Sequence, residues 1–150
     1  MGSVGQLLVG GAISVVNIAI HATVMTWVVR AARLFTARDR VAGRLFLPAV
    51  MIVVVSILMA AHACEVLVWA LAYSILGAVP AGADAIDFAF VNYTTLGYGD
   101  VLPVKGWRLL GPFTAMNGVL MFGWSTAVIF EVLRRALDLD PVRARLRNTS

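Results

Sequence analysis

Charge is scarce in this sequence. Asp, Glu, Lys and Arg together make up 13% of the 150 residues, whereas hydrophobic residues make up 61%. The mean hydropathy of +0.89 is far above that of a soluble globular domain of this length. The composition therefore excludes an ordinary soluble domain and predicts an integral membrane protein.

Cysteine is nearly absent as well, since Cys64 is the only one. A single cysteine excludes an intrachain disulfide, and its position in a long apolar stretch favours a buried packing residue over a redox switch. The sequence also lacks any arrangement typical of a catalytic nucleophile, a metal site or a nucleotide-binding loop. It therefore predicts neither an enzyme nor a protein that needs a cofactor.

Three apolar stretches are long enough to cross a membrane. A hydrocarbon core of about 30 Å needs roughly 20 helical residues, and such stretches run from Val4 to Val29, Leu45 to Leu76 and Leu109 to Leu133. The first stretch is too long, and its start too poor in charge, for a cleaved signal peptide. The pattern predicts an all-α membrane protein with three transmembrane helices. No span carries regularly spaced arginines, which excludes a voltage sensor of the usual kind.

The basic residues gather at two places, after the first span and after the third. The formal net charge is +4, but this clustering fits the positive-inside rule better than nucleic-acid binding. The rule places the linker and the C-terminus in the cytoplasm, with the N-terminus and residues 77–108 outside a plasma or inner membrane. We expect the basic segments to contact anionic membrane lipids. The clustered arginines are Arg30, Arg33, Arg38, Arg40, Arg44, Arg134, Arg135, Arg143, Arg145 and Arg147.

The segment between the second and third spans is predicted to enter the membrane without crossing it. Pro80 and Gly82 break the second span. Asp84 can cap a new helix, and Asp87 places a second carboxylate in its first turn. Residues 86–93 are too apolar for an exposed loop and too few to span the bilayer. They predict a short re-entrant helix.

The re-entrant helix is followed by Thr94-Thr95-Leu96-Gly97-Tyr98-Gly99-Asp100. One glycine on each side of Tyr98 permits a backbone conformation in which successive carbonyls point the same way. Non-helical backbone survives at membrane depth only where it is buried in protein or lines a water-filled path. We therefore expect these carbonyls to bind a desolvated cation.

At these residues the chain resembles the potassium channel family, over about residues 84–135. Residues 95–99 align with the family's Thr-Val-Gly-Tyr-Gly selectivity filter, and Asp100 with the acidic residue that follows. The resemblance implies a homotetramer, because each chain supplies one filter strand and the family needs four. It makes the second and third spans the outer and inner helices of the pore. It implies a filter at Thr95, Leu96, Gly97, Tyr98, Gly99 and Asp100, supported by Thr94, with K⁺ on the carbonyls of Thr95, Leu96, Gly97 and Tyr98.

The chain departs from the family's pattern behind the filter. Val91 stands where some bacterial members carry a glutamate that braces the filter. We predict that Glu65 of the second span, with His62 beside it, replaces this brace and reaches the re-entrant helix near Asn92 or Tyr93. The alternative is a His62–Glu65 pair that only holds helices together.

Two further polar or aromatic pairs lie on single helix faces. Trp69 and Tyr73 continue the stripe of Glu65 along the second span, and we expect them to act mostly as anchors at the membrane interface. Asn17 and His21 share a face of the first span, where a hydrogen bond between helices is favoured over an ion site.

The third span carries the candidates for gating and for the inner mouth. Gly118 and Gly123 are both possible hinges. Glu131 lies on the face that the resemblance turns toward the ion path, so it predicts an acidic ring at the cytoplasmic mouth. The alternative is an ordinary ion pair with the arginines that follow. Ser125 and Thr126 are expected to bond to the helix backbone.

These features divide the chain into three regions. Residues 1–44 form an extra N-terminal span and basic linker, residues 45–137 the pore module, and residues 138–150 a short basic tail. The predicted function is passive, potassium-selective conduction. The alternatives are a less selective cation channel, which Tyr98 argues against, and a non-conducting membrane subunit that modulates a partner.

Overall fold

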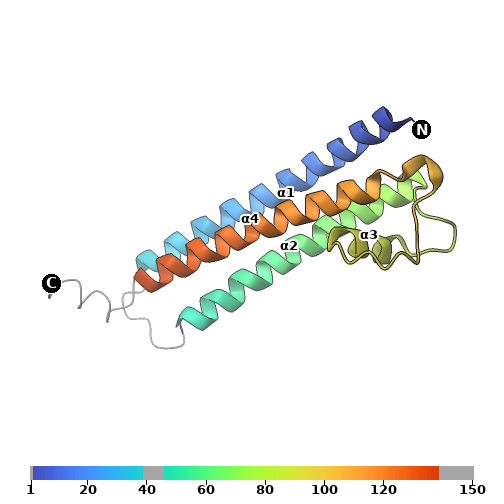
Figure 1. Cartoon of the computed structure of the whole chain (residues 1–150). Coiled ribbons are helices and arrows are strands. Elements are labelled where there is room, and N and C mark those ends of the chain that lie inside the picture. The colour runs from blue at the N-terminus through green and yellow to red at the C-terminus, as the bar shows by residue number, and fades with distance from the viewer. Residues whose placement is uncertain (1, 39–45, 139–150) are drawn as a thin grey trace.

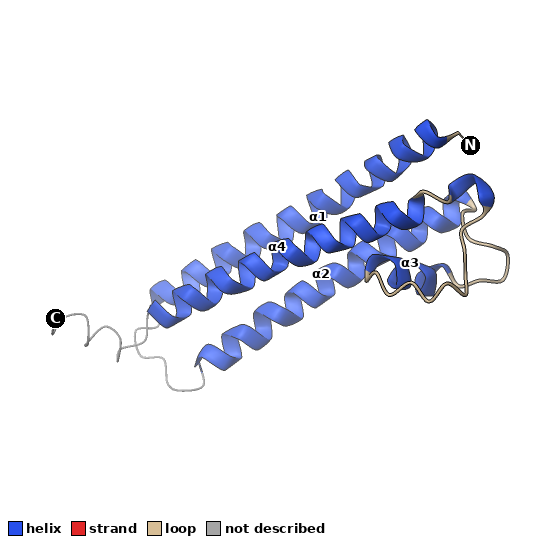
Figure 2. Cartoon of the chain, viewed as in Figure 1, coloured by secondary structure: helices blue, strands red, loops and turns tan. Residues whose placement is uncertain are grey.

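The computed structural model describes residues 2–38 and 46–138 of the chain. Three long helices, α1 (Ser3–Arg38), α2 (Phe46–Leu76) and α4 (Leu110–Asp138), make up most of it (Figure 1). Between α2 and α4 lie the short helix α3 (Ala85–Tyr93) and one 3₁₀ turn, η1 (Lys105–Trp107). The described part of the chain contains no strand, and loops join α3 to its neighbours on both sides (Figure 2).

Three stretches, each made up mostly of one long helix, are long and apolar enough to cross a membrane. These stretches are Ser3–Ala32, Leu47–Leu76 and Lys105–Leu137. The chain is therefore an all-α membrane protein, as the hydropathy predicts. The long helices run side by side, with the start of α1 at the same end as α3 and the C-terminal ends of α1 and α4 at the other (Figure 1).

The end of α1 differs from the prediction. The helix continues to Arg38, so that Arg30 and Arg33, expected in a linker, lie within it. Neither proline nor glycine interrupts residues 30–38, and Ala, Arg and Leu are strong helix formers. The rest of the predicted basic linker and nearly all of the predicted tail fall on residues 39–45 and 139–150, outside the described part.

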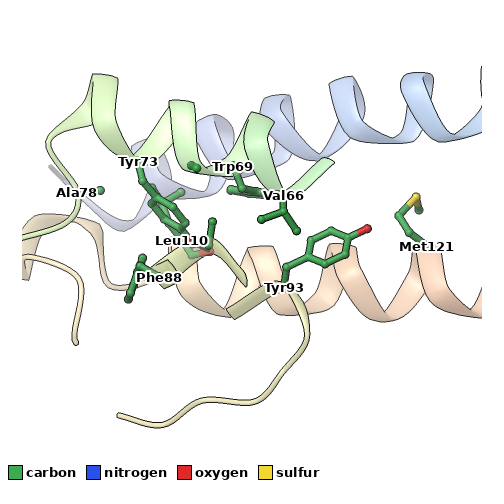
Figure 3. Packing of buried hydrophobic residues seen from close by; sticks show 10 residues of the cluster. Val66, Trp69, Tyr73, Ala78, Phe88, Tyr93, Leu110 and Met121 are labelled. Carbon is green, nitrogen blue, oxygen red and sulfur yellow. Dashed lines mark hydrogen bonds between the residues drawn. The ribbon is translucent and has the colours of Figure 1, made fainter. Parts of the chain in front are cut away.

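Two hydrophobic clusters hold the helices together. The first lies at the α3 end, where Trp69 and Tyr73 of α2 pack with Phe88 and Tyr93 of α3 and Leu110 of α4 (Figure 3). The rings of Tyr73 and Phe88 meet edge to face with centroids 4.9 Å apart, which is a favourable aromatic geometry. The second cluster joins α1, α2 and α4 at the opposite end. Its buried members are Met25, Val28, Ala32, Val54, Leu58, Val128 and Val132.

Three side chains on α2 lie where the sequence did not place them. Trp69 and Tyr73, expected as interface anchors, are both 0% exposed. Their polar atoms find partners on α4, and the Tyr73 hydroxyl lies 2.5 Å from Thr114 Oγ1. Cys64, expected to be buried, is exposed. The reason is helical geometry: one residue from Glu65 is about 100° of rotation, so Cys64 turns away from the face that Glu65 buries.

Candidate functional site

The short helix α3 begins and is held as the sequence predicts. The Asp84 side chain accepts a hydrogen bond from the Ile86 N–H at 2.8 Å, and Asp87 lies in the first turn. The nine residues of α3 span about 14 Å, too little to cross a bilayer. Phe88, Ala89 and Tyr93 are buried against α2 and α4, so the C-terminal end of α3 has a fixed position.

The backbone after α3 alternates in handedness. Thr95, Gly97 and Gly99 have φ values of 60°, 58° and 79°, whereas Leu96 and Tyr98 between them do not have positive φ. A positive φ is rare for a β-branched residue such as Thr95, and it costs about 1–3 kcal/mol in typical cases. Such strain persists where surrounding contacts impose it.

Those contacts come from the C-terminal end of α3. The N–H groups of Leu96 and Gly97 both donate to the Val91 carbonyl, at 2.9 and 3.3 Å, and the Thr95 N–H donates to the Asn92 carbonyl at 3.0 Å. All peptide bonds here are trans, so the C=O of each peptide points opposite to its N–H. The carbonyls of Thr94, Thr95 and Leu96 therefore point away from α3.

The predicted filter is open to the surroundings in the single chain. Thr94 and all residues from Thr95 to Asp100 are exposed, and Tyr98 is 70% exposed. At its ends, Thr94 Oγ1 donates to the Phe90 carbonyl at 2.7 Å, and Asp100 Oδ1 accepts from the Val101 N–H at 3.0 Å. The chain thus presents residues 94–100 as an exposed, non-helical segment with the carbonyls of Thr94, Thr95 and Leu96 pointing away from α3.

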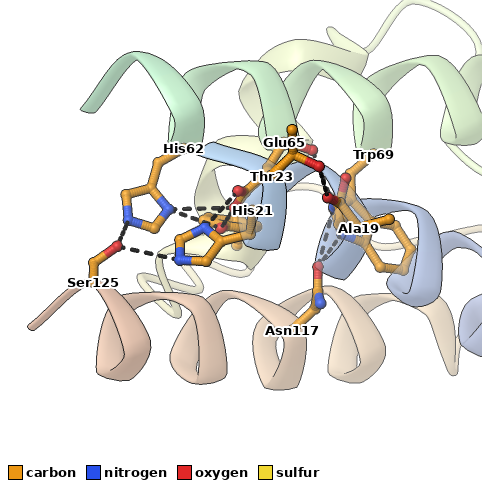
Figure 4. Close-up of polar contacts among 10 residues, drawn as sticks. Ala19, His21, Thr23, His62, Glu65, Trp69, Asn117 and Ser125 are labelled. Carbon is orange, nitrogen blue, oxygen red and sulfur yellow. Dashed lines mark hydrogen bonds and ion pairs between the residues drawn. The ribbon is translucent and has the colours of Figure 1, made fainter. Parts of the chain in front are cut away.

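Behind this strand lies a buried polar network centred on Glu65 (Figure 4). The Tyr93 hydroxyl of α3 donates to Glu65 Oε2. His21 Nδ1 of α1 lies 2.8 Å from Glu65 Oε1, and His62 Nδ1 lies 3.3 Å from Oε2. Glu65 and His21 are fully buried, and His62 also lies 3.0 Å from the Tyr93 hydroxyl. The carboxylate therefore links α1, α2 and α3.

The network extends to α4 through Ser125. Its Oγ lies 3.0 Å from His62 Nε2 and 3.5 Å from His21 Nε2. The expectation that Ser125 bonds to the helix backbone is therefore wrong, whereas Thr126 Oγ1 does donate to the Phe122 carbonyl. Ser125 faces the two histidines because α4 turns this side toward α1 and α2.

A second polar contact joins the same three long helices nearer to α3. Asn17 Nδ2 of α1 donates to Asn117 Oδ1 of α4 at 3.0 Å, and Trp69 Nε1 of α2 donates to the same oxygen at 3.1 Å. Asn17 Nδ2 also lies 3.3 Å from the Glu65 carbonyl. The predicted hydrogen bonds from Asn17 and His21 to neighbouring helices are thus confirmed.

The two hinge candidates occupy different surroundings. A Cβ added at Gly118 would overlap the Tyr93 carbonyl oxygen and lie 3.2 Å from the Tyr93 ring, whereas one added at Gly123 would meet nothing within 4 Å. Gly118 is therefore the point where α4 packs directly on the end of α3. Gly123 lies on the exposed side of α4.

Glu131 makes the ion pairs that were the alternative to an acidic ring. Its carboxylate lies 2.9 Å from Arg134 Nη2 and 2.5 Å from Arg135 Nη2. Its side chain keeps 31% exposure. The acidic ring stays a prediction, because such a ring would form between several copies of the chain around an axis, and the ion pairs lie within one chain.

Sequence reasoning missed that His21 and Ser125 belong with His62 and Glu65. His21 is 41 residues from His62, and nothing in the spacing of either span indicates which faces of α1 and α2 meet. The signal that was present is the rarity of ionisable residues in apolar spans, and His21, His62 and Glu65 are three such residues.

The fold and the loop together define the class: an all-helical membrane protein with a re-entrant helix and an open polar strand between two spans. In comparison with protein families, residues 61–135, half of the chain, match the family described as ion channel. The chain therefore belongs to the ion channel family. The matched region runs from the middle of α2 to near the end of α4, so α1 lies outside it. Comparisons with curated proteins and with solved structures found no match.

Proposed function

We propose that the chain is a potassium-selective channel, which passes K⁺ passively down its electrochemical gradient. Thr95, Leu96, Gly97 and Tyr98 supply the carbonyl oxygens that replace the water around the ion. Catalysis and a bound cofactor have no part in this function.

The observation that carries the proposal is the arrangement of the backbone after α3. The handedness alternates at Thr95, Gly97 and Gly99, and the N–H groups of residues 95–97 face the end of α3, so that the carbonyls of residues 94–96 point outward. Carbonyl oxygens are hard ligands, suited to an alkali cation and not to an anion. None of the four residues that supply these carbonyls carries a carboxylate, which favours a weakly bound ion that can leave again.

The same filter segment also supports a homotetramer. One chain offers a single row of carbonyls, and a desolvated cation needs oxygens on all sides, so several copies must surround an axis. The filter residues are exposed in the single chain, which leaves them available to face such an axis. Four copies is the number that the resemblance to potassium channels implies.

The orientation in the membrane follows the distribution of arginines. We place the filter and the start of α1 outside, and the C-terminal ends of α1 and α4 in the cytoplasm of a plasma or inner membrane. The basic linker and tail then face anionic lipid headgroups. Residues 45–137 act as the pore module, and α1 is added to its outer side.

Flux measurements on the purified chain in liposomes test this function. We expect rapid K⁺ flux with much slower Na⁺ flux, and loss of K⁺ flux in Gly97→Ala, because an added side chain disfavours the positive φ of that position. Gly11→Ala is the matched control, since a Cβ there meets nothing within 4 Å and its φ is ordinary.

The other outcomes identify the two alternatives. Equal K⁺ and Na⁺ flux would assign a less selective cation channel. Absence of flux from an assembled protein would assign a non-conducting membrane subunit. Unchanged K⁺ flux in Gly97→Ala would refute the carbonyl mechanism.

A further inference from the structure

Two histidines and a glutamate converge between α1 and α2, next to the end of α3. The ligand atoms that His21, His62 and Glu65 offer all lie within 4.8 Å of one another. His21 and Glu65 are 0% exposed, and the His62 side chain is 13% exposed. Ionisable side chains at this depth in a membrane protein are costly, and they mark functional sites by default.

Both imidazole rings are oriented in the same way. The Nδ1 atoms of His21 and His62 face the Glu65 carboxylate, and the Nε2 atoms of both face Ser125 Oγ (Figure 4). In metal sites, a histidine ligand commonly donates its other ring N–H to an oxygen, which fixes the tautomer and leaves the ligating nitrogen unprotonated. Ser125 can accept in this way from both rings.

We propose that His21, His62 and Glu65 form a binding site for a divalent transition metal, with Zn²⁺ the ion that best fits the donor set. Two imidazole nitrogens and one carboxylate oxygen are a common zinc combination that leaves a fourth position open. The Tyr93 hydroxyl lies beside Glu65 and is hydrogen-bonded to its Oε2. The nitrogen ligands disfavour Mg²⁺ and Ca²⁺, which prefer oxygen.

The dimensions of the cluster are close to those that such an ion requires. Ligands about 2.1 Å from a tetrahedral ion lie roughly 3.4 Å apart. The separation of 3.3 Å between His62 Nδ1 and Glu65 Oε2 matches this spacing, whereas that of 2.8 Å between His21 Nδ1 and Oε1 would have to widen by about 0.6 Å on binding. The two histidines close around the ion from different helices. His62 is the partly exposed ligand, so the ion would enter the site on its side.

Electrostatics favour the ion as well. Buried carboxylates are stable when they are paired or when they coordinate metals. Within the part of the chain that the structure describes, the Glu65 carboxylate has the Tyr93 hydroxyl and two imidazoles within hydrogen-bonding distance, and no Lys or Arg. A bound dication would compete with the Tyr93 hydroxyl for Oε2. The site therefore couples metal binding to the end of α3, whichever ion the pore carries.

Zinc binding to the full-length chain in detergent tests the site. All samples carry Cys64→Ser, because Cys64 is an exposed thiol that binds zinc by itself. In equilibrium dialysis against ZnCl₂ we expect one ion per chain. His62→Gln should weaken the affinity by more than Ser125→Ala, whose loss of an outer contact should cost about 10–100-fold. Asp87→Asn, which removes an exposed carboxylate in the first turn of α3, should bind like the parent.

A second measurement keeps both histidines intact. X-ray absorption at the zinc edge of the Cys64→Ser chain should show two imidazole ligands and oxygen, even if a histidine variant fails to assemble. Absence of stoichiometric zinc, a spectrum without imidazole, or unchanged affinity in a well-assembled His62→Gln would each overturn the proposal. In those cases the cluster serves only as a hydrogen-bonded link between helices.

Discussion

The Tyr93 hydroxyl, at the C-terminal end of α3, donates a hydrogen bond to Oε2 of Glu65 on α2. Both side chains are fully buried. Because Tyr93 lies two residues before Thr95, this bond fixes the base of the predicted filter to α2. In our proposal, Glu65 thereby takes the place of a brace that Val91 does not provide.

Glu65→Gln tests that role. The amide keeps the shape of the carboxylate but loses its charge, and hydrogen bonds to charged groups contribute about 1.5–3 kcal/mol, against about 1 kcal/mol for neutral ones. We expect conduction to be lost faster during sustained K⁺ flow, or the ion preference to change, while the tetramer stays assembled. Time-resolved currents and size-exclusion chromatography measure the two properties.

Tyr93→Phe is the matched variant, since it removes only the hydroxyl from the other end of the same bond. Its effect should have the same direction, and the double variant should be no worse than the more severe single one, as expected for two residues that share one interaction. Wild-type behaviour of an assembled Glu65→Gln channel would rule out the brace.

The sequence predicts the contact of Glu65 with the end of α3, but it does not predict the partners that α1 and α4 add. Helical spacing alone places His62, Glu65, Trp69 and Tyr73 on one side, and the structure buries that side almost completely. Which residues of α1 and α4 meet that face depends on how the helices pack, and spacing within a single helix carries no information on that. His21 and Ser125 were therefore assigned to other roles.

Gly118→Ala and Gly123→Ala separate a packing glycine from a flexible one. At Gly118 the new methyl group would overlap the Tyr93 backbone carbonyl, and such overpacking costs typically about 1–3 kcal/mol. We expect a lower thermal midpoint or failed assembly. At Gly123 there is open space, so alanine should assemble normally and, by stiffening the helix, reduce opening if Gly123 is the hinge.

The decisive measurement is thermal unfolding of both variants in the same detergent, followed by single-channel opening for those that assemble. Equal stability of the two variants would show that α4 does not rest on Tyr93 as closely as described. Normal opening in Gly123→Ala would remove Gly123 as a hinge.

Asn117→Ala tests the polar contact that joins α1 to α2 and α4. The substitution leaves Asn17 Nδ2 and Trp69 Nε1 without the shared acceptor. Hydrogen bonds between membrane helices contribute about 0.6 kcal/mol on average, and unpaired buried donors cost about 1–3 kcal/mol. We expect a fall in the thermal midpoint, whereas the control Thr126→Ala, at an exposed residue of the same helix, should change it little. A midpoint equal to that of the control would mean that the contact does not stabilise the fold.

The remaining differences between sequence and structure have local causes. A span predicted from hydropathy ends where charged residues begin. A helix can continue past that point when no residue interrupts its backbone, and α1 continues through Arg33 to Arg38. From composition alone, a cysteine in an apolar span is expected in the interior. Its burial depends on which face of the helix it occupies, and Cys64 lies on an exposed face. The start of α3 was predictable because the capping bond is local: Asp84 accepts it from the backbone N–H of Ile86, two residues later.

Glu131→Gln tests the predicted acidic ring at the cytoplasmic mouth. In the structure its carboxylate is paired with Arg134 and Arg135 on its own helix, so the local net charge is positive even with Glu131 present. The substitution nevertheless removes one negative charge per chain, and four copies around the axis would all lose it. If Glu131 borders the ion path, K⁺ becomes scarcer at the inner entrance.

We therefore expect the outward single-channel current of Glu131→Gln to fall at low salt and to recover at high salt, because the Debye length shortens from about 30 Å at 0.01 M to about 3 Å at 1 M. Arg135→Gln is the control of opposite sign, and it should raise the current at low salt. Together the two variants separate charge from structure, since a disturbed helix end would lower the current in both. A Glu131→Gln current that matches the parent at both salt concentrations would place Glu131 away from the ion path, as a surface ion pair and nothing more.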